Sequence, residues 1–402
     1  MELIEKNACT GCMACADVCP KKAIIIQPDA CGFLYPEINK DICIDCGLCQ
    51  SVCPVKDSFK NKKNRRIYAC WNKDASKRFS ATSGGTFLVL AGHIIKSGGV
   101  VYGAAFDEQY KLRHQKVDTV EQLPILSGSK YVQSNTQNIF SDVKSELESG
   151  KKVLFSGTPC QVSALKKYLK KDYESLYCVD LVCHGVPSPK VFEDYLNYQR
   201  EKNDGAEPVS INFRYKKPCW SVFSMKINFD NKNVYESSKF RDPYLMLFLS
   251  DLNLRPSCFE CRFTSLDRPG DITLGDFWGF LTVKKSQRDI EKGTGLVLVN
   301  TEKGEELLNA SSDELHLEKH YEFEALRSNQ SFKKPWRKPE KYDEFWSDYS
   351  VMAFSEIAEK YCIYDESAEK RKYQEAMQRA EHYKKPFSRI KYSLRVLKNS
   401  LG

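Results

Sequence analysis

Eight cysteines near the amino terminus form two copies of one pattern, and this repeat constrains the fold more than any other feature of the chain. In each copy, two-residue gaps separate three cysteines, a fourth cysteine follows after three more residues, and a proline comes next. The copies are Cys9, Cys12, Cys15 and Cys19, and then Cys43, Cys46, Cys49 and Cys53. Three closely spaced thiolates suit one face of an iron–sulfur cubane, so the repeat predicts two [4Fe-4S] clusters.

The same spacing is typical of bacterial two-cluster ferredoxins, in which the fourth cysteine of each copy binds the other cluster. We therefore predict two quartets: Cys9, Cys12, Cys15 and Cys53 for one cluster, and Cys43, Cys46, Cys49 and Cys19 for the other. The alternative is a pair of zinc sites, although zinc ribbons usually combine two separated pairs of cysteines. The predicted ferredoxin domain spans residues 1–56.

The composition is that of a globular protein: of 402 residues, 42% are hydrophobic and 28% are charged. No apolar run approaches the roughly 18 residues of a membrane-spanning helix, and the first residues do not resemble a secretion signal. We therefore expect a cytoplasmic protein, in which seventeen cysteines favour metal binding or catalysis over disulfides. Thiolate-bound clusters offset part of the net charge of +8, so we expect no nucleic-acid partner.

Residues 57–66 are polar and basic, and they predict a linker to a second domain over residues 67–330. In this domain predicted strands alternate with predicted helices, as in proteins with a partly parallel sheet. The strands are expected at 67–71, 100–106, 112–117, 152–155, 176–182 and 296–299, and the helices at 87–95, 138–149, 159–170 and 189–201. After Pro208, alternating apolar residues around a turn at 230–233 predict antiparallel hairpins.

The predicted fold class is therefore α+β or α/β. It combines a ferredoxin-like two-cluster module, a mixed and partly parallel α/β domain with antiparallel hairpins, and a helical C-terminal tail.

Four more cysteines have positions that suit a third metal centre. Cys160 begins a predicted helix after one strand and Cys183 follows the next strand, so both lie at the carboxyl edge of the sheet if these strands are parallel. Cys258 and Cys261 form a C-x-x-C pair in a predicted loop, and we predict that the four bind a third [4Fe-4S] cluster. Three alternatives remain open: a reactive Cys160 thiolate, a structural zinc site, and unrelated thiols. The remaining cysteines are expected to be packed thiols: Cys31, Cys70, Cys178, Cys219 and Cys362.

Several segments of the second domain carry distinctive motifs: Thr82–Gly85, Gly128–Ser134, Phe155–Gln161, Cys183–Ser188, Cys258 with Cys261, and Gly270–Gly279. In this order, over about residues 67–300, they resemble the coenzyme F-420 hydrogenase/dehydrogenase beta-subunit family, whose members often carry a ferredoxin repeat in front. Members are FAD-dependent iron–sulfur oxidoreductases, including deazaflavin-reducing subunits and reductases of chlorophyll intermediates. The resemblance implies that this chain binds FAD.

The expected FAD contacts are Thr82, Ser83, Gly84, Gly85, Lys130, Tyr131, Ser134 and Thr294. A Ser-Gly-Gly turn before a helix offers free backbone amides and the positive end of the helix dipole to a pyrophosphate. Lys130 suits an anionic group and Tyr131 suits ring packing, although a glycine pair is also compatible with a simple turn and an exposed lysine with solvation. No G-x-G-x-x-G sequence precedes a helix, so a Rossmann dinucleotide site has no support.

The expected function is an oxidoreductase in which single electrons pass through the clusters and FAD exchanges electron pairs with an organic substrate or deazaflavin. The alternatives are an electron-transfer beta subunit of a larger hydrogenase or dehydrogenase, and a non-enzymatic redox sensor. The expected partners are ferredoxin, or another low-potential electron carrier, and a small-molecule substrate. The sequence assigns neither the substrate nor a catalytic proton donor, because His184 is equally suited to orienting the loop next to Cys183.

Residues 331–402 form a predicted helical C-terminal extension. Near its end, apolar residues recur at helical spacing among basic ones: Phe387, Ile390, Leu394, Leu397 and Leu401. This pattern predicts a basic amphipathic helix, which suits either peripheral contact with an anionic membrane surface or ordinary docking on the protein body.

Overall fold

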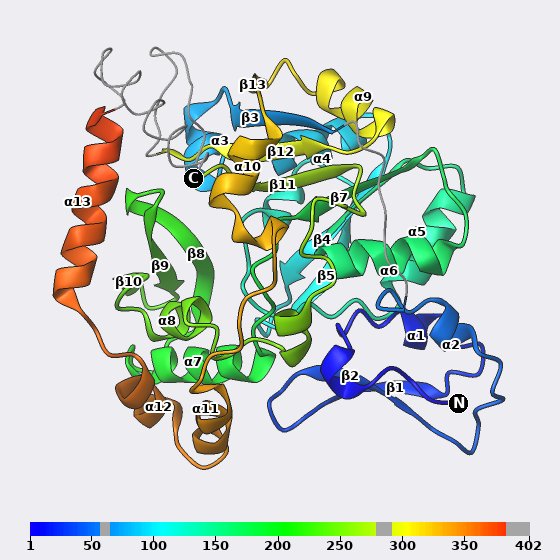
Figure 1. Ribbon diagram of the computed structural model, residues 1–402, viewed down its shortest axis with the longest axis horizontal. Helices are drawn as coiled ribbons and strands as arrows, with labels where there is room; N and C mark the ends of the chain where they lie inside the picture. Colours follow the sequence, from blue (N-terminus) through cyan, green and yellow to red (C-terminus); the bar gives the residue numbers. More distant parts are fainter. Residues whose placement is uncertain (57–64, 279–291, 383–402) are drawn as a thin grey trace.

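A computed structural model describes residues 1–56, 65–278 and 292–382, and among residues 376–382 it describes the backbone alone. Figure 1 shows the N-terminal module below α5 and α6, a large central sheet, and a smaller sheet beside α13. The described residues contain no helix that is long and apolar enough to cross a membrane. The predicted linker at 57–64 and the predicted basic helix over 383–402 lie outside the described residues.

The N-terminal module is ferredoxin-like, as predicted. A short helix contains the third cysteine of each pattern, and an antiparallel hairpin lies between the two patterns. The elements are α1 (Ala14–Asp17), β1 (Ile24–Pro28), β2 (Leu34–Ile38) and α2 (Leu48–Ser51).

The central sheet has eight strands in the order β13-β3-β12-β11-β7-β6-β4-β5. The pairs β4–β6, β6–β7 and β7–β11 are parallel and the other pairs are antiparallel, so the predicted mixed sheet is confirmed. The strands are β3 (Arg66–Asn72), β4 (Val100–Phe106), β5 (Leu112–Val117), β6 (Val153–Gly157), β7 (Leu176–Leu181), β11 (Ile272–Asp276), β12 (Gly295–Val299) and β13 (Leu315–His320). The sequence interpretation did not include β11 and β13.

Helices cover both faces of this sheet because its strands bury side chains on both sides. On β6, Leu154 packs into the core beneath α4, whereas its neighbours Val153 and Phe155 pack on the opposite face with α5 and α6. The helices around this sheet are α3 (Ala75–Ser80), α4 (Thr86–Lys96), α5 (Ile139–Glu148), α6 (Pro159–Leu169), α9 (Glu302–Ala310) and α10 (Glu322–Ser328). Arg65 belongs to the predicted linker and is among the described residues. It forms an ion pair with Asp267 at 2.7 Å.

The predicted hairpins form a separate three-stranded antiparallel sheet, in the order β10-β9-β8. The C-terminal helices α11 and α12 share a hydrophobic core with this sheet through residues such as Phe213, Tyr195 and Phe345. The elements of this part are α7 (Pro189–Glu201), β8 (Pro208–Cys219), β9 (Val222–Phe229), β10 (Val234–Ser238), α8 (Pro243–Leu249), α11 (Tyr342–Tyr349), α12 (Phe354–Tyr361) and α13 (Glu366–His382).

Candidate functional site

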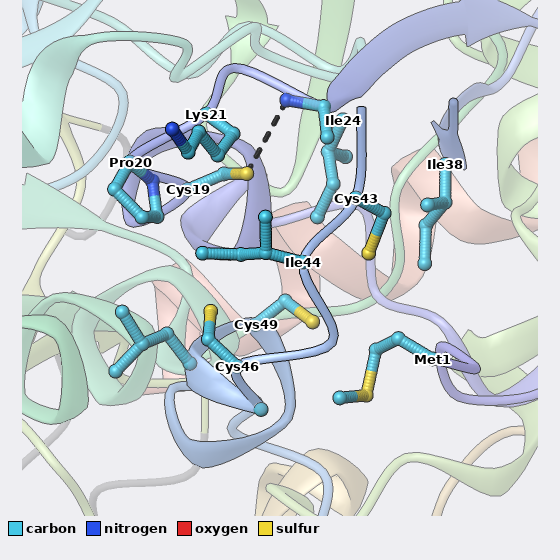
Figure 2. Close-up of a pocket in the computed structure, with 13 residues that line it drawn as sticks. Met1, Cys19, Pro20, Lys21, Ile24, Ile38, Cys43, Ile44, Cys46 and Cys49 are labelled. Atoms are coloured by element: carbon cyan, nitrogen blue, oxygen red, sulfur yellow. Dashed lines mark hydrogen bonds between the residues drawn. The ribbon is translucent and has the colours of Figure 1, made fainter. Parts of the chain in front are cut away.

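The first small cavity of the ferredoxin-like module lies between β1, β2 and α2, and four cysteines line it: Cys19, Cys43, Cys46 and Cys49 (Figure 2). These are the four residues predicted for the second cluster. The Ala23 amide donates a hydrogen bond to Cys19 Sγ at 3.3 Å, as expected of a backbone group that stabilises a thiolate. Cys46 is exposed, and the flanking Ile44 is 57% exposed, so this quartet lies close to the protein surface.

A second small cavity is lined by Cys9, Cys12, Cys15 and Cys53, the four residues predicted for the other cluster. This quartet lies deeper, against the second domain, where Cys12, Ala14 and Val52 share a hydrophobic core with α5 and α6. Burial raises the pKa of the Cys15 thiol to about 12, and the neighbouring Cys9 adds to the rise. Stable thiolates at these positions therefore require a cationic partner.

The other four candidate ligands come from three separate segments. Cys160 is in the first turn of α6, directly after β6, and Cys183 follows β7. Because β6 and β7 are parallel neighbours, both cysteines lie at the same edge of the sheet. Cys258 lies in the short 3-10 helix Pro256–Glu260, and Cys261 follows that helix.

The four sulfur groups of this third quartet are close enough that each interacts electrostatically with the other three. Burial raises the pKa of Cys160 to about 11 and that of Cys258 to about 12, and it raises the pKa of Cys183 well above its usual value. The Cys12 thiol of the ferredoxin-like module also interacts electrostatically with Cys160. Within the described residues, no group of three or more His, Cys, Asp or Glu side chains is arranged to hold a single metal ion.

A cavity of about 1100 Å³ adjoins the third quartet, and both Cys160 and Cys183 line it. It extends over the carboxyl edge of the parallel strands to the turn before α4. Most of the residues predicted to contact FAD line the same cavity: Thr82, Ser83, Gly84, Gly85, Lys130, Tyr131 and Ser134. Thr294 is not among the lining residues; it is buried behind the turn, and its carbonyl oxygen accepts a hydrogen bond from the Ser83 hydroxyl at 2.9 Å.

The turn at Ser83–Gly85, before α4, is packed so closely that it leaves no room for a larger side chain at Gly84. A Cβ atom at Gly84 would lie 2.1 Å from the Cys70 carbonyl oxygen and 2.8 Å from the Gly295 amide nitrogen. The buried Lys216 ammonium donates hydrogen bonds to the carbonyl oxygens of Arg78, Ser83 and Lys292 at 2.7, 2.6 and 2.6 Å. The turn is therefore fixed with its backbone toward the cavity.

Lys130 is the main titratable group beside this turn. Its ammonium donates hydrogen bonds to the carbonyl oxygens of Ser127 at 2.8 Å and Gly128 at 3.3 Å. Burial lowers its pKa to about 7, so near neutral pH an anion in the cavity would favour proton uptake by Lys130. Nearby, burial lowers the pKa of His114 to about 4, and the neutral ring contacts the Ser134 hydroxyl at 2.8 Å.

The opposite wall carries residues that sequence reasoning did not identify. The ring of Tyr131 stacks on Phe248 with centroids 4.4 Å apart, and its hydroxyl accepts a hydrogen bond from Arg214 at 3.1 Å. Arg214 also pairs with Asp276 at 3.0 Å, beside the exposed ring of Trp278. Asp276 and Trp278 lie within the predicted Gly270–Gly279 motif, whereas Arg214 lies in a hairpin with no recognisable signal.

His184 also lines the cavity, where its Nε2 contacts Asp251 Oδ1 at 2.6 Å and its ring lies 4.5 Å from that of Trp336.

Of the cysteines expected to be packed thiols, three are buried, whereas Cys31 and Cys362 are only partly buried. None of the seventeen cysteines forms a disulfide.

Comparisons with known proteins match two parts of the chain to family models. Residues 150–322 match the family model for the C terminus of the coenzyme F420 hydrogenase/dehydrogenase beta subunit, and residues 8–56 match that of a 4Fe-4S dicluster domain. No curated protein matches the chain. Among solved structures, the chain is similar to one in "Xenon derivatization of the F420-reducing [NiFe] hydrogenase complex from Methanosarcina barkeri", with 14% identity, a TM-score of 0.45, and coverage of 75% of this chain and 93% of that chain.

Proposed function

Because residues 150–322 match the family model for the C terminus of the coenzyme F420 hydrogenase/dehydrogenase beta subunit and residues 8–56 match that of a 4Fe-4S dicluster domain, we propose that this chain is an FAD-dependent iron–sulfur oxidoreductase. The dicluster domain supplies two clusters, and the third quartet would bind another. When bound, FAD would supply the conversion between single electrons and electron pairs that reduction or oxidation of an organic substrate or deazaflavin requires. One observation carries the proposal: Cys160 and Cys183 line the same cavity as the glycine turn.

The chemistry of the third quartet supports a metal cluster. The thiols of Cys160, Cys183 and Cys258, whose pKa burial and the neighbouring cysteines raise, are unfavourable as thiolates unless a metal neutralises them. The positions of Cys160 and Cys183, at the ends of parallel strands, are where open α/β sheets bind their ligands.

The chain's own residues also fit FAD. The backbone at Ser83–Gly85 would hold a pyrophosphate at the start of α4, and Lys130 would add positive charge as it takes up a proton. Tyr131, held by Phe248 and Arg214, offers an aromatic wall for ring packing. These contacts would orient FAD without a Rossmann motif.

The cluster positions support an order of electron transfer. The quartet of Cys19, Cys43, Cys46 and Cys49 lies near the surface and suits exchange with ferredoxin or another low-potential carrier. The deeper ferredoxin quartet contains Cys12, which interacts with Cys160 of the third quartet. Single electrons would therefore pass through these centres in series, in either direction.

The test combines metal analysis with flavin binding. After anaerobic reconstitution with iron, sulfide and FAD, the chain should retain flavin absorbance and about twelve irons. A Cys258→Ala variant should fall to about eight irons, whereas Cys178→Ala, which alters a buried thiol on β7 outside the quartets, should keep about twelve. Eight irons in the unaltered chain would contradict the third cluster, and failure to bind FAD would contradict the flavin assignment.

The family match also supports a second candidate function, an electron-transfer subunit, because the matched model describes a beta subunit. Purification from the native host would distinguish the two. A stable large partner that restores substrate turnover would favour the subunit, whereas turnover by the isolated chain would favour a self-contained enzyme.

A further inference from the structure

Arg255 connects the loop of the third quartet with the ferredoxin-like module. It lies three residues before Cys258, and its side chain is fully buried. Its Nε donates a hydrogen bond to the Cys9 carbonyl oxygen at 2.7 Å, and Nη1 donates to the Leu34 carbonyl oxygen at 3.1 Å. One guanidinium therefore binds the backbone of the ferredoxin-like module on both sides of its first cluster loop.

The positive charge of Arg255 has no carboxylate partner among the described residues, and its Nη2 has no hydrogen-bond partner there. The other buried arginines beside the cavity and the third quartet differ: Arg214 pairs with Asp276, and Arg268 pairs with Asp180. Removing a charge from water costs several kcal/mol unless opposite charge is nearby. The Tyr35 ring, whose centroid lies 3.9 Å from the guanidinium carbon, offsets part of this cost, and a negative charge close to Arg255 would offset the rest.

The nearest candidates are the thiolate centres. Arg255 interacts electrostatically with Cys160 and Cys258, where its positive charge opposes the rise in thiol pKa that burial causes. On its other side it binds the Cys9 backbone. A cubane with four thiolate ligands carries net negative charge, so two such centres would supply the missing counter-charge.

Gly11 and Gln133 pack directly against the Arg255 guanidinium. A Cβ atom at Gly11, in the loop between Cys9 and Cys12, would lie 2.9 Å from Arg255 Nη1 and 2.4 Å from Gln133 Nε2. Glycine at this position therefore allows the loop to approach Arg255 closely. Gln133 completes the contact, since its Oε1 accepts hydrogen bonds from the Leu34 amide at 3.0 Å and from Arg255 Nη1 at 3.3 Å.

We propose that Arg255 is a positioning residue that couples the ferredoxin-like module to the third cluster. Its hydrogen bonds hold the Cys9 loop against the Cys258 loop, and its charge favours the reduced forms of both adjacent clusters. This inference rests on the third cluster of the proposed function. It implies that one buried cation raises the reduction potentials of both centres.

The test compares three full-length variants after anaerobic reconstitution with iron and sulfide. Arg255→Met removes the buried charge, Arg255→Lys keeps charge without the forked geometry, and Arg262→Met removes a charge next to Cys261 that solvent screens. The measurements are iron content and redox titration followed by electron paramagnetic resonance. In Arg255→Met we expect at least one cluster to become about tenfold harder to reduce, which is about 59 mV for one electron.

Arg262→Met should leave the potentials unchanged, and Arg255→Lys should shift them less than Arg255→Met does while weakening magnetic coupling between the adjacent clusters. If Arg255→Met fails to fold, the lysine variant decides the question through that coupling. Unchanged potentials in Arg255→Met, or unchanged coupling in Arg255→Lys, would overturn the inference. Eight irons in the unaltered chain would instead show that the proposed third cluster is absent.

Discussion

In the proposed FAD site, Lys130 would make binding depend on pH, and its position gives the size of the effect. Burial in the cavity wall lowers its pKa from the usual 10.5 to about 7. The free protein therefore holds a neutral Lys130 above pH 7 and a charged one below it. A bound phosphate would raise this pKa again, so binding at higher pH must be accompanied by proton uptake.

The magnitude follows from the protonated fraction. With a pKa of about 7, the charged form falls from about 91% at pH 6 to about 9% at pH 8. FAD affinity should therefore weaken about tenfold over this interval, with the tighter binding on the acidic side. His114 does not titrate in this range, because its pKa is lowered to about 4. Lys239, which also lines the cavity and has a pKa of about 8, begins to contribute only at the upper end.

The assay is a fluorescence titration of FAD against the iron-loaded chain at pH 6, 7 and 8. Lys130→Met should bind FAD more weakly at pH 6 and lose much of the pH dependence, leaving the part due to Lys239 and to Lys216, which contacts the Ser83 carbonyl oxygen and whose pKa burial lowers to about 7. Lys130→Arg should stay charged throughout and show the same reduced pH dependence. An unchanged slope in Lys130→Met would refute the reasoning, because the titrating group would then lie elsewhere.

Three further predictions concern the parts that hold this site, each measured by anaerobic thermal or denaturant unfolding. Gly84→Ala should lower the free energy of unfolding by about 2–3 kcal/mol and weaken FAD binding, since its Cβ would collide with the backbone at Cys70. The matched control is Gly92→Ala, inside α4, where a Cβ would make only ordinary contacts; this variant should be neutral or stabilising. Asp17→Ala should cost about 1–2 kcal/mol, because the Asp17 carboxylate accepts hydrogen bonds from two amides at the start of α5, and a neutral result would mean that this contact does not stabilise the docked module. Lys216→Met should cost about 2–3 kcal/mol by leaving three carbonyl oxygens without a donor; no loss of stability would show that water replaces the ammonium.

The sequence predicted those parts of the molecule that depend on local spacing. The two-residue gaps between cysteines determine how the thiolates surround a cavity, and apolar periodicity identified β4, β5 and β6 to within two residues of their observed bounds. The position of Cys160 after a strand was likewise a local observation. The strands β11 and β13 were missed because their apolar patterns are short and interrupted by polar residues.

The far wall of the cavity was unpredictable for a different reason. Arg214 reaches Tyr131 and Asp276 across 83 and 62 residues of sequence, and no periodicity reports such a contact. Thr294 shows the opposite error. It lies in a glycine-flanked segment beside the turn, but its side chain is buried and only its backbone supports the cavity wall.

The interface between the two domains favours a fixed electron path over a mobile shuttle. Three polar contacts across it bind carbonyl oxygens of cluster cysteines: the Thr136 hydroxyl on that of Cys12 at 2.8 Å, Lys167 on that of Cys53 at 3.1 Å, and Arg255 on that of Cys9 at 2.7 Å. Buried hydrogen bonds of this kind must be broken together if the module swings away, and each leaves an unsatisfied group that costs about 1–3 kcal/mol. The same contacts hold the Cys12 side of the module against Cys160, whereas the quartet containing Cys46 remains toward the surface. In the proposed electron path, exchange with an external carrier would therefore need no domain movement, because the quartet near the surface and the deeper one belong to the same ferredoxin-like module.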